Sequence, residues 1–83
     1  MKIDLTKRAT KDLDALGRSR PQLYGKVIAK IEALGNDPAL GKPLVGPLKG
    51  LRSLGVGDYR IVYEKEKDAI VVLTVNHRRE VYR

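Results

Sequence analysis

The apolar residues of this chain follow a helical period in its first half and a strand period in its second half. Between residues 24 and 34, apolar side chains recur at the three- and four-residue intervals that place them on one face of a helix. From Leu48 onward, short runs rich in β-branched residues are separated by turn residues, as expected for successive strands. Helices followed by strands predict an α+β fold, in which a two-helix hairpin packs on one face of an antiparallel β-sheet.

The N-terminal segment predicts a short strand followed by a helix. Residues 2–5 (KIDL) alternate apolar and polar side chains, which indicates a strand. Thr6 is a candidate helix N-cap, because its hydroxyl can accept a hydrogen bond from a free amide of the first turn. Apolar residues then recur at helical spacing at Ala9, Leu13 and Leu16. Gly17 is expected to end this helix, because glycine adopts the left-handed backbone of a helix C-terminus most easily.

A second helix is expected to begin at Ser19 and to end at Gly35. Pro21 falls in its first turn, where the missing amide hydrogen removes no hydrogen bond. Its apolar face consists of Tyr24, Val27, Ile28, Ile31 and Leu34. Because about two residues join the helices, they are expected to form an antiparallel hairpin.

The second half of the chain predicts a loop and then three strands. Residues 36–47 contain three prolines and two glycines, and proline cannot donate to a strand ladder. The expected strands are 48–54, 59–65 and 69–75, with turns at 55–58 and 66–68. The run 69–75 is nearly all apolar, which favours a central strand covered on both faces. In strand 59–65, Arg60, Val62 and Glu64 share one face, and Tyr59, Ile61 and Tyr63 share the other.

The composition suits one small domain, residues 1–83, and excludes several kinds of protein. A chain without cysteine forms neither disulfides nor cysteine-ligated zinc sites. Its apolar runs are shorter than the ~20 residues that cross a membrane. Charged side chains occur throughout residues 1–15, unlike a signal peptide, so we expect a cytoplasmic protein without membrane contact.

The net charge of the chain is strongly positive. It carries 17 Lys and Arg against 10 Asp and Glu, a formal charge of +7. Such an excess favours solubility, and it also favours binding to a polyanion such as nucleic acid or to an acidic protein. Charge alone leaves both interpretations open.

Four sequence blocks in the second half closely resemble the RelE/ParE toxin superfamily, and its RelE branch most of all. They are residues 41–44 (GKPL), 48–52 (LKGLR), 57–63 (GDYRIVY) and 75–83 (VNHRREVYR). Each block alone is weakly specific, but four blocks in this order and spacing are strongly so. With the helical hairpin ahead of them, the resemblance covers nearly the whole chain.

The resemblance implies a RelE-like fold and the toxin of a type II toxin–antitoxin system. RelE-like toxins enter the ribosome and cleave messenger RNA there, and a cognate acidic antitoxin of the RelB type blocks them. It also implies a toxin–antitoxin heterotetramer as one form of the complex. ParE-like relatives share the fold but inhibit DNA gyrase, which remains an alternative function.

Metal-independent RNA cleavage makes particular demands on side chains. The ribose 2′-hydroxyl is the nucleophile, and the reaction needs a proton acceptor, a proton donor and stabilisation of the charged phosphorane. His77 is the only histidine, so two histidines cannot share the proton transfers. The carboxylates are scattered along the chain, which does not favour a two-metal site, and no metal or cofactor is expected.

By the resemblance, Arg60, Arg78 and Tyr82 are the catalytic residues. Arg60 matches the family's arginine in the Gly-Asp-Tyr-Arg strand, and Arg78 matches its arginine after the last strand. Both would grip the scissile phosphate, since a guanidinium is permanently charged and binds two oxygens at once. Tyr82 matches the C-terminal tyrosine and would act as general base or stack on a nucleobase. As a base, its pKa of ~10 would have to be lowered by cations such as Arg78 and Arg79.

Further basic residues are candidates for RNA contacts, and structural alternatives remain for the whole set. The candidates are Lys49, Arg52, His77, Arg79 and Arg83. Arg60 could instead pair with Glu64, and Tyr82 could pin the C-terminus. The C-terminal arginines could grip an acidic antitoxin rather than RNA.

The chain departs from the family pattern in the strand before Arg60. Gly55 stands where a basic residue is common, and Leu51 and Ser53 stand where RelE carries two lysines. Arg52 is one residue out of phase and is therefore expected on the opposite face. Three interpretations remain: a bulge that lets Lys49 or Arg52 supply the charge, an attenuated toxin that Gly55→Arg would strengthen, or a gyrase-directed relative.

Overall fold

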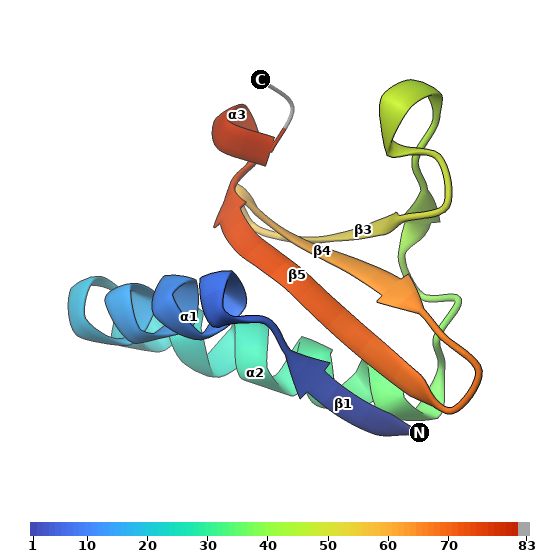
Figure 1. Cartoon of the computed structure of the whole chain (residues 1–83). Helices are drawn as coiled ribbons and strands as arrows, with labels where there is room; N and C mark the ends of the chain where they lie inside the picture. Colours follow the sequence, from blue (N-terminus) through green and yellow to red (C-terminus); the bar gives the residue numbers. More distant parts are fainter. Residues whose placement is uncertain (82–83) are drawn as a thin grey trace.

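The computed structural model describes residues 1–81, apart from the side chain of residue 81. Figure 1 shows two long helices against one side of a sheet, with the short C-terminal helix and a loop rising beyond the sheet's other side. In chain order the elements are β1 (Lys2–Leu5), α1 (Lys7–Ser19), α2 (Pro21–Asn36), β2 (Lys42–Pro43), the 3-10 turn η1 (Gly46–Leu48), β3 (Arg52–Val56), β4 (Tyr59–Lys65), β5 (Ala69–His77) and α3 (Arg78–Val81).

The five strands form one mixed sheet in the order β1-β5-β4-β3-β2. β2, β3, β4 and β5 pair antiparallel, and β1 joins β5 in parallel, with Leu5 opposite Val72. The parallel pairing follows from the connection, because the chain leaves β1 directly into the helices and returns to the sheet much later. The predicted α+β fold with a helical hairpin on the sheet is confirmed.

The core lies between the hairpin and the sheet. Its largest fully buried side chains are Tyr63, Leu34, Ile61, Ile70, Val27, Val72 and Val75. Burial of each such side chain stabilises the fold by about 1.5–3 kcal/mol. The predicted apolar stripe of the second helix supplies Val27, Ile31 and Leu34 to this core, whereas Tyr24 stays at the surface. None of the helices within residues 1–81 has the length and apolar character needed to span a bilayer.

The N-cap of the first helix was predicted correctly, but its C-terminal end was not. Thr6 accepts a hydrogen bond from the Ala9 amide (3.0 Å), as predicted, and its hydroxyl also donates to the Leu73 carbonyl (2.8 Å). The prediction that Gly17 ends the first helix is wrong, because α1 continues to Ser19. A Cβ at Gly17 would lie 3.4 Å from the Tyr24 ring, so this glycine allows the two helices to approach each other.

The start and end of α2 also differ from the prediction. Ser19 belongs to α1, where its hydroxyl donates to the Ala15 carbonyl (2.9 Å), and Arg20 is the junction between the helices. Pro21 lies in the first turn, as predicted. Gly35 lies inside the last turn rather than after it, where a Cβ would come within 3.3 Å of the Met1 carbonyl.

Two of the three strands predicted in the second half of the chain have different ends in the structure. The strand 59–65 is confirmed, but the strand before it runs from Arg52 to Val56, and the turn is confined to Gly57 and Asp58. Gly57 has a φ of +60°, which glycine adopts without strain. The predicted loop contains the two-residue strand β2, and its Pro43 is tolerated because β2 is an edge strand.

The apolar run predicted as a strand covered on both faces extends to His77 as β5. It lies inside the sheet between β1 and β4, but only Ile70, Val72 and Val75 are buried. The prediction of two covered faces is therefore wrong, because the helices cover only one of them. The pairing with β4 slips by one residue at Leu73, which forms a β-bulge.

Asp12 of α1 joins the helix to β5 beside this bulge. Its Oδ2 accepts from the Thr74 hydroxyl (2.6 Å) and the Val75 amide (3.0 Å), and its Oδ1 accepts from Arg8 Nε (3.2 Å). The Asp12 side chain is only 11% exposed, unlike its partner Arg8. The Asp12 carboxylate therefore provides a charged hydrogen-bond acceptor for the Val75 amide of β5.

We expect Asp12→Asn to lower the free energy of unfolding by about 1.5–3 kcal/mol, the usual value of hydrogen bonds to a charged group. The measurement is urea unfolding of both proteins. Asp14→Asn, an exposed carboxylate on the same helix, is the matched control and should stay within about 0.5 kcal/mol of the parent. Equal losses of unfolding free energy in the two variants would contradict the role of Asp12 in joining α1 to β5.

Candidate functional site

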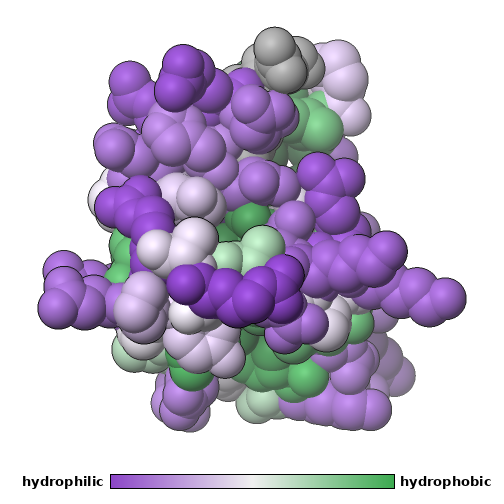
Figure 2. All heavy atoms as spheres, turned by 90° about the vertical axis from the view of Figure 1, so that its left-hand side faces the viewer, coloured by the Kyte–Doolittle hydropathy of each residue, from purple (hydrophilic) through white to green (hydrophobic). Residues whose placement is uncertain are grey.

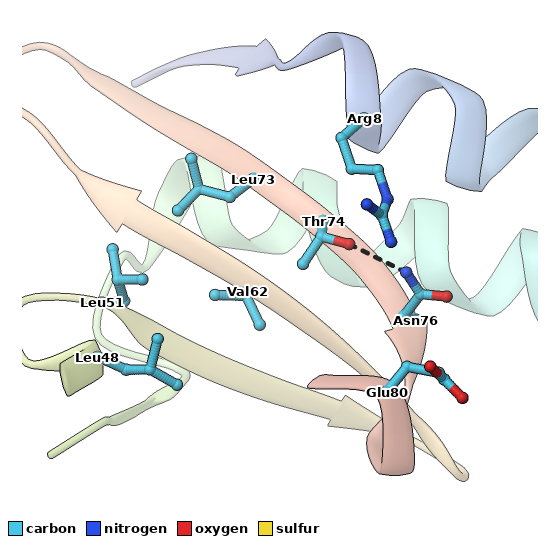
Figure 3. Close-up of a pocket in the computed structure, with 8 residues that line it drawn as sticks. All are labelled: Arg8, Leu48, Leu51, Val62, Leu73, Thr74, Asn76 and Glu80. Atoms are coloured by element: carbon cyan, nitrogen blue, oxygen red, sulfur yellow. Dashed lines mark hydrogen bonds between the residues drawn. The ribbon is translucent and has the colours of Figure 1, made fainter. Parts of the chain in front are cut away.

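A hollow of about 240 Å³ lies on the sheet face that the hairpin leaves open. Figure 3 shows its apolar residues on one side and its polar residues on the other. Its lining consists of Leu48, Leu51, Val62 and Leu73 on the apolar side and of Arg8, Thr74, Asn76 and Glu80 on the polar side. An apolar floor with a polar edge can accommodate a flat ring that carries hydrogen-bonding groups.

The polar side of the hollow is held by connected hydrogen bonds. Asn76 Nδ2 donates to the Thr74 hydroxyl (3.2 Å), which in turn donates to Asp12. The same carboxylate accepts from Arg8, which Figure 3 shows reaching from α1 toward Asn76. The network orients the Asn76 amide and the Arg8 guanidinium at the edge of the hollow. Neither residue was identified from the sequence, because α1 and β5 are far apart in the chain.

Arg60 lies near the start of β4, on the same open face of the sheet. Its Nη1 donates to the Tyr59 carbonyl (3.2 Å) and makes a longer contact with the Gly57 carbonyl (3.5 Å). Within residues 1–81 the ion pairs are Lys2–Asp4 and Arg8–Asp12, so the alternative that Arg60 pairs with Glu64 is not realised. Its partners among residues 1–81 are neutral carbonyls, and no carboxylate of this part of the chain compensates its positive charge.

The Arg60 side chain extends over β3 rather than over the hollow. Its main chain pairs with Gly55 on one side and with Asn76 on the other, and its guanidinium borders a second hollow beside Lys42, Ser53 and Gly55. Ser53 lies on this same face, as predicted from the strand register.

The start of α3 is fixed at the same end of the sheet as Arg60. The Arg78 amide donates to the Asp58 carbonyl in the β3–β4 turn (2.7 Å). The Arg79 amide donates to Nδ1 of His77 (3.2 Å). Both arginine side chains are exposed, and Figure 2 shows hydrophilic residues dominating the upper part of the molecule, at the height of α3. Of the predicted catalytic residues, Tyr82 lies outside the described residues, as does Arg83.

Three other predicted RNA-binding residues lie in different surroundings. His77 contacts the Tyr59 ring edge-on, with 5.9 Å between ring centroids, and Arg20 lies 5.7 Å from the centre of the same ring. Arg52 pairs opposite Tyr63 on the helix-facing side and donates to the Gly41 carbonyl (2.8 Å). It therefore binds the protein's own backbone on the face opposite Arg60. Lys49 is exposed after η1, on the loop that supplies Leu48 to the hollow.

No grouping of three or more His, Asp or Glu side chains that could bind a metal occurs within residues 1–81. The described part of the open face offers arginine, amide and hydroxyl groups above apolar side chains, together with the carboxylate of Glu80. These groups favour an anionic ligand that also has flat apolar parts, which is the character of a nucleotide.

Comparison with known proteins gives a consistent family. Residues 3–82 match the family model described as the ParE toxin of the type II toxin–antitoxin system, parDE. No curated protein sequence matches the chain. Among solved structures, the toxin–antitoxin complex RelBE2 from Mycobacterium tuberculosis contains a chain that is 30% identical, with a TM-score of 0.80 over 93% of this chain and 96% of that one.

Two further solved structures share the fold at lower identity. The YoeB/ParE toxin from Agrobacterium tumefaciens is 23% identical, with a TM-score of 0.81 over 93% of this chain and 98% of its own. YafQ from E. coli is 19% identical, with a TM-score of 0.81 over 99% of this chain and 98% of its own. Because the family model matches nearly the whole length, the chain belongs to the ParE toxin family of type II toxin–antitoxin systems, within the RelE/ParE toxin superfamily.

Proposed function

We propose that this toxin is an endoribonuclease that cleaves messenger RNA on the ribosome without a metal ion. The observation that carries the proposal is Arg60, whose guanidinium lies on the open sheet face with carbonyl partners and no carboxylate among residues 1–81. A cation in this condition can bind a phosphate without first breaking an ion pair.

The proposed reaction begins when the ribose 2′-hydroxyl attacks the adjacent phosphorus and loses its proton. The bond to the 5′-oxygen then breaks as that oxygen takes up a proton from solvent water, which leaves a cyclic phosphate and a free 5′-hydroxyl. Arg60 and Arg78 stabilise the charge on the phosphorane, and Tyr82 takes the proton or stacks on a base. The hollow next to Asn76 receives the flat ring of a nucleobase, with Leu73 and Val62 beneath it.

The proposed enzyme has fewer cations than its RelE-like relatives. Ser53 and Gly55 occupy the Arg60 face, and Leu51 lines the hollow, so none of them carries charge. Arg52 cannot replace them because it faces the other way. Loss of one phosphate-binding cation costs about 10²–10³ in rate, so we propose a slower enzyme than a toxin with the full set.

An acidic antitoxin of the RelB type is the proposed partner. The net charge of +7 favours such a protein, and two of the similar structures are toxin–antitoxin complexes: RelBE2 from Mycobacterium tuberculosis and the heterotetrameric YoeB–YefM complex from Staphylococcus aureus. Steering by opposite charge would speed the association. Coexpression with a short acidic neighbouring gene should yield a complex that copurifies, and separate elution in low salt would contradict the proposal.

Inhibition of DNA gyrase is the second candidate, favoured by the ParE family model and by the fold shared with the ParDE system of Pseudomonas aeruginosa. The two functions differ in their first effect on a cell. We expect induction in a bacterial host to stop translation within minutes and to create new RNA 5′ ends inside translated messages. DNA-damage signalling and filamentation, with intact messages, would instead support gyrase as the target.

A further inference from the structure

We propose that Gly55 is a positioning residue that seats the Arg60 guanidinium on β3. We call the contact between the Arg60 guanidinium and the strand at Gly55 the seat. Its importance for catalysis rests on the proposed nuclease function, whereas the contact itself is independent of that function. Gly55 and Arg60 face each other across the β3–β4 ladder, and their side-chain positions lie on the same, open face. The absence of a side chain at residue 55 leaves space that the Arg60 head group occupies.

The geometry leaves no room for a larger residue beneath this head group. A Cβ at Gly55 would overlap with Arg60 Nη1 and would lie 3.0 Å from Cζ and 3.7 Å from Nε. Nη1 also donates to the Tyr59 and Gly57 carbonyls, so the guanidinium is held by these two hydrogen bonds and by contact with the strand at Gly55. A substituent at residue 55 would lift the head group off β3 and turn it toward solvent.

The backbone at Gly55 does not require glycine. The glycines with positive φ are Gly46, Gly50 and Gly57, so within residues 1–81 Gly55 is not among those that need a left-handed backbone. In a strand interior, glycine normally makes the fold less stable than alanine does. A packing role for Gly55 in the core is also excluded, because the residue is exposed on the open face. Within the described residues, the atoms that a Cβ at residue 55 would meet are those of Arg60.

A seated guanidinium is useful because binding a phosphate would otherwise immobilise a flexible arginine. That immobilisation costs side-chain entropy. Gly55 thus allows Arg60 to occupy the space above β3. An arginine at residue 55 would displace the existing cation instead of adding to it.

Gly55→Ala tests the seat, with Gly25→Ala as the matched control, since a Cβ at Gly25 meets nothing within 4 Å. The first readout is the nitrogen-15 NMR signal of the Arg60 guanidinium, assigned through its loss in Arg60→Lys. We expect restricted, shifted signals in the parent and in Gly25→Ala, and signals like those of free arginine in Gly55→Ala. An unchanged Arg60 signal in Gly55→Ala would overturn the proposal.

The second readout is cleavage of a message in a translation extract. Gly55→Ala should lower kcat by about 10–100-fold with little change in KM, because the misplaced cation acts on the phosphorane. Its melting temperature should equal or exceed that of the parent, and a fall in stability that accounts for the lost activity would count against a positioning role. If the parent does not cleave, the nuclease proposal fails while the NMR result still decides the seat.

A double-mutant cycle with Arg60→Lys separates the contact from other effects of alanine. Lysine has no atom at the Nη1 position, so a Cβ at residue 55 should not displace its head group. In the Arg60→Lys background, Gly55→Ala should therefore change kcat by less than about twofold. Fully additive losses would show that residues 55 and 60 act independently and would contradict the proposal.

Discussion

Replacing Arg60 with alanine should lower the rate of messenger RNA cleavage by about 10²–10³-fold without unfolding the protein. The guanidinium lies on the open face, where it contributes hydrogen bonds to two backbone carbonyls but no core packing. Its loss removes a cation that would stabilise the phosphorane. The measurement is single-turnover cleavage of a message in a translation extract, together with thermal unfolding of the purified variant.

Lys65→Ala is the matched control for Arg60→Ala. It removes the same charge from the other end of β4, where the side chain is exposed. This control should retain cleavage within about threefold, because distant exposed charges are screened by salt. Equal activity of the two variants would show that Arg60 has no special role.

Replacing Tyr63 with phenylalanine should lower the free energy of unfolding by about 2–4 kcal/mol. The loss comes from two backbone groups in the loop before β3, which would no longer have the Tyr63 hydroxyl as hydrogen-bond partner. The Tyr63 ring is fully buried, and its hydroxyl accepts from the Gly41 amide (2.9 Å) and donates to the Pro38 carbonyl (2.7 Å). Phenylalanine keeps the packing but leaves both backbone groups without this partner. Such a loss is a large part of the 5–15 kcal/mol that typically stabilises a domain.

The Tyr63 prediction can be measured by urea unfolding and by amide hydrogen exchange. Exchange at Gly41 should accelerate more than exchange in β5, because the hydroxyl holds the loop rather than the sheet. Tyr24→Phe is the control, since Tyr24 is 36% exposed, and it should change stability by less than about 0.5 kcal/mol. A similar small effect in both variants would contradict the role of the Tyr63 hydroxyl.

The parts of the fold that the sequence predicts well are those set by local rules. The Thr6 cap, the Pro21 position and the strand 59–65 depend on neighbouring residues and on the alternation of apolar side chains. The helix ends do not, because Gly17 and Gly35 are explained by contacts between segments. Glycine as a helix terminator and glycine as a point of close approach look the same in one sequence.

In the candidate site too, the features set by local sequence were predicted, and those set by contacts between distant segments were not. The sequence points to Arg60 and Arg78 through their family motifs, and the structure brings both to one end of the sheet. The Arg8–Asp12 network and the seat at Gly55 could not be predicted, because they depend on the register of β3 with β4 and on the contact between α1 and β5. Gly55, where the sequence lacks a basic residue common in the family, is also the residue proposed to position the Arg60 guanidinium.

We propose that the open sheet face of this toxin acts on messenger RNA. The most direct test adds the purified protein to a reconstituted translation reaction and maps RNA ends by primer extension, with a gyrase supercoiling assay run in parallel. We predict cleavage inside the translated message only when ribosomes are present, no cleavage with Arg60→Ala, and normal supercoiling by gyrase. Intact messages together with inhibited supercoiling would contradict the account.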